Sequence, residues 1–203
     1  NPTGTRIARA DLLRLRDGLP GDVLLVIDEA YGEFADGLDE PMFDLVARGD
    51  TVVLRTLSKA YGLAGARVGW GLFPPAVARE IRKVMSPNNI PAASQAAATA
   101  AVTDQAYMHE TCALTAEMRD SFAGRLRQSG FDVPESHTNF VLIRLGDPDR
   151  AQGAEAALRA EGIILRPQGA VGMGDCLRAT VGQAGAMDAT AEILEHWARK
   201  ETT

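Results

Sequence analysis

The chain has few cysteines, few histidines and no long apolar segment. Its two cysteines, Cys112 and Cys176, lack the spacing of metal ligands and are expected to be reduced thiols rather than a disulfide. The three histidines are scattered, which argues against a metal site. No apolar run approaches the roughly 20 residues that cross a bilayer, and no signal peptide is recognisable. These absences predict a cytoplasmic protein that binds neither a metal nor a membrane.

Basic residues are also in the minority. Lysine and arginine together number 21, against 27 aspartate and glutamate residues, so the formal net charge is −6. Because a nucleic-acid backbone is neutralised by a basic face, this balance argues against nucleic acid as a partner. The chain is otherwise ordinary for a globular enzyme, with 46% hydrophobic and 24% charged residues over 203 positions. That length is enough to bury a substantial core.

Apolar periodicity predicts alternating strands and helices through most of the chain. The run at 23–27 is too short for a free helix and is typical of a parallel strand buried on both faces. The run at 68–73 contains two glycines, which suggest close backbone packing or an antiparallel edge. We expect strands over 23–27, 52–54 and 68–73. We expect helices over 9–15, 42–47, 76–85 and 93–102, and a long helix from an N-cap at Asp104 to about 129.

The last part of the chain has a different pattern. We expect strands over 138–144, 163–165 and 177–181, and helices over 151–160 and 186–199. Strands and helices in this order predict a compact α+β unit of about 75 residues attached to an α/β part. We therefore predict two domains, with residues 1–128 in the α/β part and residues 129–203 in the small α+β part.

A lysine with two hydroxyls before it and an arginine after it follows the strand predicted at 52–54. Lys59 can form a Schiff base with an aldehyde. Thr56, Ser58 and Arg67 supply hydrogen-bond donors for a phosphate. The segment is thus suited to a phosphorylated aldehyde, although taken alone it is equally compatible with a polar turn that carries a solvated lysine.

Polar residues also follow the strand predicted at 23–27. The carboxyl ends of strands form the ligand crevice of open α/β sheets, so a functional carboxylate is expected at Asp28. A pyridoxal phosphate site needs a carboxylate against the pyridine nitrogen and a lysine that carries the cofactor, and Asp28 and Lys59 supply both. Tyr31 and Asn1 are candidates to hydrogen-bond the ring oxygen of the cofactor. The alternatives are a turn cap for Asp28 and a packed rim residue for Tyr31.

An arginine lies inside the apolar strand predicted at 177–181. A charge in such a strand costs free energy unless it is paired. The guanidinium of Arg178 therefore suits bidentate capture of a substrate carboxylate or phosphate, with an internal salt bridge as the alternative. Arg166, which follows the strand predicted at 163–165, is a further candidate for the same role.

Four segments, taken together and in order, make the chain resemble the fold-type I pyridoxal-phosphate aminotransferases, most closely the histidinol-phosphate aminotransferase branch. They lie at 1–4, at 28–31, at 55–61 together with 65–69, and at 177–182. The resemblance implies an α/β fold like that of aspartate aminotransferase. On this resemblance, the chain contains part of the sheet of the large domain, with helices on both faces, followed by a small α+β C-terminal domain.

The resemblance also implies a role for each candidate residue. Lys59 is the catalytic Schiff-base lysine, and Asp28 pairs with the pyridine nitrogen of pyridoxal 5'-phosphate. The other cofactor contacts implied are Asn1 and Tyr31 on the ring hydroxyl and Thr56, Ser58 and Arg67 on the phosphate. Arg178 and Arg166 are the implied contacts of the substrate carboxylate or phosphate.

The implied activity is transfer of an amino group between histidinol phosphate and 2-oxoglutarate, through glutamate, in histidine biosynthesis. The family forms homodimers. Three alternatives stay open: an aromatic amino-acid aminotransferase, a phosphothreonine decarboxylase, and a transcription regulator whose aminotransferase-like domain only senses the cofactor. Family members carry a large portion before the Asn-Pro-x-Gly turn that opens this chain. We therefore expect the chain to be the C-terminal part of a longer protein and not to turn over alone.

Overall fold

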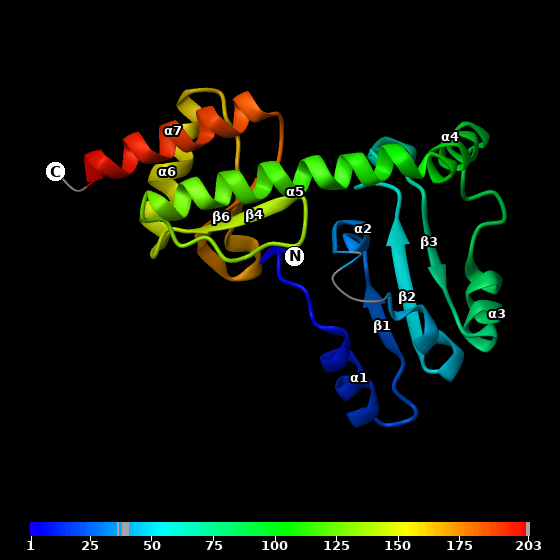
Figure 1. The fold of residues 1–203 in the computed structure, drawn as a ribbon. Coiled ribbons are helices and arrows are strands. Elements are labelled where there is room, and N and C mark those ends of the chain that lie inside the picture. Colours follow the sequence, from blue (N-terminus) through cyan, green and yellow to red (C-terminus); the bar gives the residue numbers. More distant parts are fainter. Residues whose placement is uncertain (36, 38–40, 202–203) are drawn as a thin grey trace. The chain divides into compact units, whose positions relative to one another are not determined.

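The structure, a computed structural model, describes residues 1–35, 37 and 41–201 (Figure 1). These residues form two compact units. The N-terminal unit is Ile7–Cys112, and the C-terminal unit combines Asn1–Arg6 with the chain from Ala113 onward. The division therefore falls inside a helix, at 112/113, and differs from the predicted boundary after residue 128.

A three-stranded sheet forms the centre of the N-terminal unit (Figure 1). Its strands are β1 (Leu25–Asp28), β2 (Thr51–Thr56) and β3 (Gly69–Leu72), in the order β1-β2-β3. β1 runs parallel to β2, and β3 runs antiparallel to β2 at the edge. The antiparallel edge predicted from the glycines is confirmed. A Cβ at Gly69 would lie 2.9 Å from the backbone oxygen of Arg55 in β2, so the close approach of the two strands favours glycine there.

One face of this sheet is covered by helix α1 (Arg9–Gly18) and the 3-10 helix η1 (Met42–Arg48). The buried cluster on that face comprises Ile27, Met42, Leu45 and Val53, with Leu12, Leu13, Leu25, Phe43 and Val46 packed against it. Val26 points to the other face and is 52% exposed. The prediction that this strand is buried on both faces is therefore wrong for the chain as described, because its side chains alternate between covered and exposed.

Helices complete the N-terminal unit. Helix α2 spans Gly32–Ala35, the 3-10 helix η2 spans Ala64–Ala66, and helices α3 and α4 span Pro75–Val84 and Ala92–Thr103. The long helix α5 spans Gln105–Gln128, close to the predicted range. Its N-cap is confirmed, because the backbone nitrogen of Tyr107 donates to the carboxylate of Asp104 at 3.1 Å.

The C-terminal unit contains a second, wholly antiparallel sheet in the order β4-β6-β5. Its strands are β4 (Phe140–Arg144), β5 (Arg166–Gln168) and β6 (Met173–Thr180), with the 3-10 helix η3 (Gly169–Val171) between β5 and β6. The strand predicted at 163–165 is wrong, since pairing begins only at Arg166. Ile164 is 71% exposed and lies before the first residue paired with β6.

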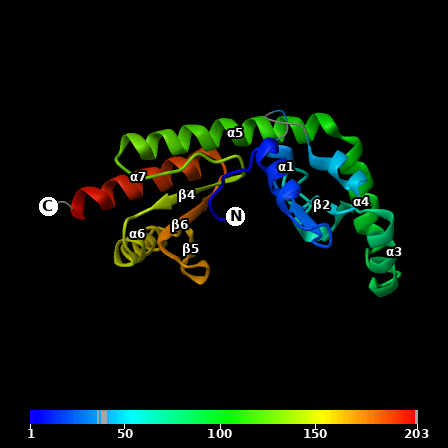
Figure 2. The ribbon, with the colours of Figure 1, turned by 90° about the horizontal axis from the view of Figure 1, so that it is seen from below.

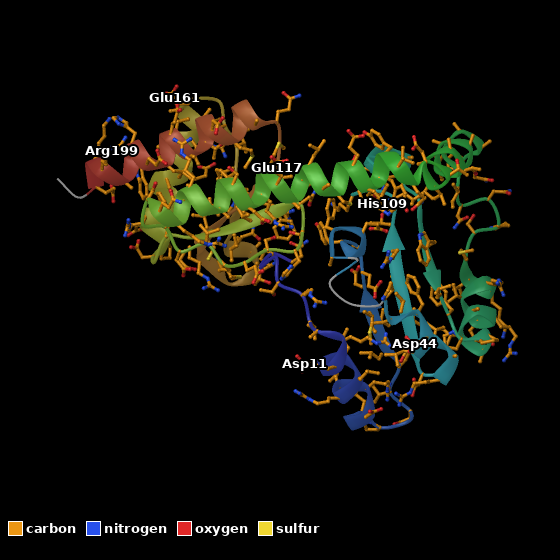
Figure 3. The ribbon with its side chains drawn as sticks, in the orientation of Figure 1. Asp11, Asp44, His109, Glu117, Glu161 and Arg199 are labelled. Atoms are coloured by element: carbon orange, nitrogen blue, oxygen red, sulfur yellow. The ribbon has the colours of Figure 1, made fainter. Side chains whose placement is uncertain are left out.

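Helix α6 (Pro148–Ala160), helix α7 (Ala184–Glu201) and the C-terminal part of α5 pack around this second sheet (Figure 2). They bury a large apolar cluster that includes Phe122 and Leu126 of α5, Leu158 of α6 and Leu194 of α7. Glu161 and Arg199 are exposed and point away from the sheet (Figure 3). Residues Asn1–Arg6 belong to this unit, and the backbone nitrogen of His137 donates a hydrogen bond to the backbone oxygen of Gly4 at 2.8 Å.

Across the residues that the structure describes, none of the helices combines the length and the apolar character that a membrane span requires.

Candidate functional site

The register of β1 and β2 places two predicted site residues on one face of the sheet. Asp28, the last residue of β1, pairs with Leu54 of β2. Partners in a ladder share a face and side chains alternate along a strand, so Thr56 shares that face with Leu54 and Asp28. Ile27 and Val53 point to the opposite, covered face. The carboxylate and the start of the lysine segment thus meet at the carboxyl end of two parallel strands, where α/β sheets bind ligands.

Two hydroxyls and a guanidinium form a hydrogen-bonded group just beyond β2. The Thr56 hydroxyl donates to the Ser58 hydroxyl at 2.9 Å, and Nη1 of Arg67 donates to the same Ser58 oxygen at 3.4 Å. Nη1 of Arg67 also donates to the Ala64 carbonyl at 2.9 Å. Arg67 has a left-handed backbone with φ of 54°. We call Thr56, Ser58 and Arg67 the phosphate-type cluster, because hydroxyls and a guanidinium are donors that bind phosphate.

Lys59 is held between two buried neighbours. Leu57 is 2% exposed and Ala60 is fully buried, whereas Lys59 itself is half-buried. The backbone nitrogen of Leu57 donates to the Val68 carbonyl at 3.0 Å, which closes the segment into a loop. The Lys59 Nζ atom lies 5.4 Å from the centroid of the Tyr31 ring, within cation–π range. The structure therefore brings together two residues predicted to serve the same site.

The Asp28 side chain is exposed and partly used by its own turn. One carboxylate oxygen, Oδ1, accepts a hydrogen bond from the backbone nitrogen of Ala30 at 3.0 Å. The turn-cap role considered as an alternative is therefore present. A carboxylate has about four lone-pair sites, so this bond leaves it able to accept from a ligand as well.

The predicted substrate-binding arginines lie opposite each other in the C-terminal unit. Arg166 of β5 pairs with Arg178 of β6, so both side chains are on one face of the sheet. The Arg178 guanidinium lies 4.8 Å from the Phe140 ring centroid, and its Nη1 donates to Oδ1 of Asn1 at 2.8 Å. Its Nε is buried without a hydrogen-bond partner in the described structure. Like charges placed opposite one another are unfavourable, and an anion between them would offset that repulsion.

The nine predicted site residues divide between the two units. The N-terminal unit contains Asp28, Tyr31, Thr56, Ser58, Lys59 and Arg67. The C-terminal unit contains Asn1, Arg166 and Arg178. Asn1, expected at the cofactor ring together with Tyr31, has its amide oxygen hydrogen-bonded to Arg178.

Three charged side chains next to the site, two of them buried and one partly buried, were assigned no role from the sequence. Arg55 forms ion pairs with Glu29 at 2.9 Å and with Glu33 at 3.4 Å. The sequence did contain a signal for these ion pairs, because Arg55 directly follows the apolar run of β2 and a charge at that position requires partners. The same reasoning had singled out Arg178 in β6. Within the described ranges, no group of three or more metal-ligating side chains is found.

Comparison with known proteins gives consistent matches. A family model described as aminotransferase class I and II matches residues 1–195. The chain is 44% identical over 200 residues to a histidinol-phosphate aminotransferase of Rhodospirillum centenum, covering 97% of this chain and 55% of the relative. It is 42% identical over 183 residues to the histidinol-phosphate aminotransferase of a Jannaschia species, covering 90% of this chain and 51% of the relative.

Among solved structures, the chain resembles histidinol-phosphate aminotransferase from Sinorhizobium meliloti in complex with pyridoxal-5'-phosphate. The TM-score is 0.91 at 31% sequence identity, and the match covers 99% of this chain and 56% of that one. The chain thus spans about half the length of the relatives that it matches. With its strand-end lysine, its phosphate-type cluster and a family match along nearly its whole length, the chain belongs to the aminotransferase class I and II family.

Proposed function

We propose that the protein is a pyridoxal-phosphate-dependent aminotransferase, which exchanges an amino group between histidinol phosphate and 2-oxoglutarate in histidine biosynthesis. The observation that carries the proposal is the grouping of Lys59, Asp28 and the phosphate-type cluster at the carboxyl ends of β1 and β2. The substrate choice is supported by relatives named histidinol-phosphate aminotransferase at 44% and 42% identity.

The residues present fit the proposed cofactor. The phosphate-type cluster offers two hydroxyls and a guanidinium, which suit the phosphate group. Asp28 would face the pyridine nitrogen, Lys59 the aldehyde carbon, and Tyr31 and Asn1 the ring oxygen. When bound, pyridoxal phosphate supplies an aldehyde that takes up the amino group and a protonated ring that draws electrons from the substrate.

The side chains of the chain then have separate roles. The Lys59 amine removes and returns the proton at the α-carbon of the substrate, as a general base and acid. The carboxylate of Asp28 favours the protonated form of the ring nitrogen through its negative charge. The Tyr31 ring, 5.4 Å from Nζ, limits the directions in which the lysine can move.

We propose that Arg178 and Arg166 bind the anionic group of each substrate in turn. The pair faces one side of the sheet, and Arg178 has an unsatisfied buried Nε. Histidinol phosphate offers a phosphate and glutamate offers a carboxylate, and a guanidinium binds either in a bidentate manner. We further propose that the protein acts as a homodimer, as the resemblance to the family implies, and that it is cytoplasmic.

The cofactor assignment is tested with protein expressed from the complete reading frame that contains these 203 residues. The protein is mixed with pyridoxal phosphate, treated with borohydride and digested. Peptide mapping should find the cofactor attached irreversibly to Lys59. Attachment at another lysine, or no saturable binding, would contradict the proposal.

The substrate assignment is tested by the initial rates of amino transfer to 2-oxoglutarate. We expect histidinol phosphate to be preferred over phenylalanine by at least about tenfold in kcat/KM, which is about 1.4 kcal/mol in transition-state binding. A tenfold preference for phenylalanine would instead identify an aromatic amino-acid aminotransferase. Release of carbon dioxide from phosphothreonine would identify a decarboxylase.

A further inference from the structure

Three charged side chains, two buried and one partly buried, lie behind the strand ends that carry the candidate site. The side chain of Arg55 is 7% exposed, and its partners Glu29 and Glu33 are 14% and 2% exposed. Nε and Nη2 of Arg55 each lie 2.9 Å from Oε2 of Glu29, and Nη1 lies 3.4 Å from Oε1 of Glu33. We call these three residues the charge cluster.

The charge cluster lies on the face of the sheet opposite to the site. Because side chains alternate along β2, Arg55 points away from the face that carries Thr56. The backbone nitrogen of Glu29 donates to the Leu54 carbonyl at 2.9 Å, which extends the pairing one residue beyond Asp28. The ion pair between Glu29 and Arg55 therefore connects β1 and β2 directly behind Asp28 and Thr56.

Packing holds the guanidinium of Arg55 from several sides. Its Cζ atom lies 4.9 Å from the centroid of the Phe43 ring. The chain passes close by at Gly32, where a Cβ would lie 2.8 Å from the same Cζ. Glu29 also accepts a hydrogen bond from the backbone nitrogen of Met42 at 3.3 Å, through its Oε1. Arg55 and Glu29 are thus each held by contacts outside their own ion pair.

We propose that the charge cluster is a positioning device for the cofactor site, an inference that rests on the proposed function. Glu29 is adjacent in sequence to Asp28, Glu33 is two residues beyond Tyr31, and Arg55 precedes the segment of Thr56 and Lys59. A planar guanidinium forms hydrogen bonds in fixed directions, so it sets the spacing of these segments as well as balancing charge. Binding sites depend on such support, because small displacements of their contacts lower affinity and rate.

The test compares the two ends of the same strand pair. Glu29→Gln keeps the shape of the side chain but removes its charge, and Arg55→Lys keeps the charge but removes the fork of donors. The matched controls are Asp50→Asn and Arg16→Lys. Arg16 and Asp50 form an ion pair at 3.5 Å, and the Asp50 carbonyl accepts from the first residue of β1 at 3.0 Å. The controls therefore loosen the other end of β1 and β2.

Three quantities are measured on protein from the complete reading frame: the Kd for pyridoxal phosphate, the pH midpoint of the absorbance of the bound cofactor, and the Tm without cofactor. We expect Glu29→Gln and Arg55→Lys to raise the Kd by about tenfold or more and to shift the pH midpoint. We expect Asp50→Asn and Arg16→Lys to lower the Tm while the Kd stays within about twofold of wild type and the pH midpoint is unchanged.

Other outcomes separate the two proposals. If Glu29→Gln binds the cofactor with the wild-type Kd and pH midpoint, the charge cluster does not position the site. If the controls lose affinity by the same factor, the effect is general loss of stability and the inference is again overturned. If Arg55→Lys does not fold, the Kd and pH midpoint of Glu29→Gln alone decide whether the charge cluster positions the site. Failure of the wild type itself to bind pyridoxal phosphate would overturn the proposed function, whatever the variants do.

Discussion

The two sheets of the chain are stabilised in different ways. In the C-terminal unit, four consecutive residues of β4, Phe140–Ile143, are at most 1% exposed, and α5, α6 and α7 contribute to one large apolar cluster. In the N-terminal unit the apolar cluster is small, Val26 is exposed, and two arginines and a glutamate are buried instead. The sheet of the N-terminal unit is therefore supported by buried ion pairs as well as by a small apolar cluster, and it carries the candidate chemistry at its strand ends.

The largest expected effect is a loss of activity, at a residue of the N-terminal unit that should contribute little to stability. Lys59→Ala should lower amino transfer by about 10³-fold or more, because the proposed base for the substrate proton is lost. Its stability should change by no more than about 0.5 kcal/mol, since the side chain belongs to no apolar cluster. The measurements are kcat with histidinol phosphate and urea unfolding. Lys83→Ala, at an exposed lysine of α3, is the control and should keep full activity.

The apolar cluster of the C-terminal unit should show the largest stability effect. Leu194 is fully buried in that cluster, so Leu194→Ala should lower the free energy of unfolding by about 2–5 kcal/mol through lost contacts and a cavity. Val84→Ala, at a side chain that is 86% exposed, should change it by less than about 0.5 kcal/mol. Urea denaturation measures both. A cost below about 1 kcal/mol at Leu194 would remove the contrast between the units.

A smaller effect is expected at the buried arginine of α1. Arg16 donates to the backbone oxygens of Leu19, Pro20, Val23 and Asp50. Arg16→Met should therefore destabilise the N-terminal unit by about 1–3 kcal/mol, because carbonyls lose their donors. Hydrogen exchange should become faster in β1 and stay unchanged in β4. Arg14→Met, at an exposed arginine of the same helix, is the control. Equal acceleration in β4 would show that the units do not open separately.

The smallest effect concerns an ion pair between α5 and α7. Arg125 forms two hydrogen bonds to Glu195, at 2.8 and 2.9 Å, and this contact lowers the pKa of Glu195. A carboxylate with a lowered folded-state pKa stabilises the fold above its unfolded-state pKa, and this contribution is lost as the pH falls through the folded-state pKa. Glu195→Gln should thus be less stable than wild type at about pH 7, and the difference should shrink towards about pH 3. The urea midpoints of wild type and Glu195→Gln at both pH values measure this stability difference. A difference that does not depend on pH would exclude the ion pair as its cause.

Much of the fold was predictable because short apolar runs and caps are local signals. The strand that precedes Asp28, the strand that precedes Lys59 and the N-cap at Asp104 were all expected at or near their observed positions. The strand predicted at 163–165 failed because an apolar run does not specify where backbone pairing starts. The pairing of β5 is fixed by its register with β6, in which Arg166 is opposite Arg178.

The candidate site was likewise predictable only in part from the sequence. The residue types that suit a phosphorylated aldehyde, a lysine with hydroxyls and an arginine nearby, were visible without coordinates. The burial of Arg55 between Glu29 and Glu33 was not, because the partners of a charge are contributed by segments distant in sequence.

By itself, the sequence determined the class of fold, and it predicted the ends of β1 and β2 as the place of the polar chemistry and the residues that we propose to carry it. These follow from hydrophobic patterning, which acts over a few residues. Only the tertiary structure decided that Asp28 and Thr56 share a face, that the charge cluster lies behind them, and that β5 begins at Arg166. Register and burial depend on hydrogen bonds and contacts between distant segments, so no local pattern specifies them.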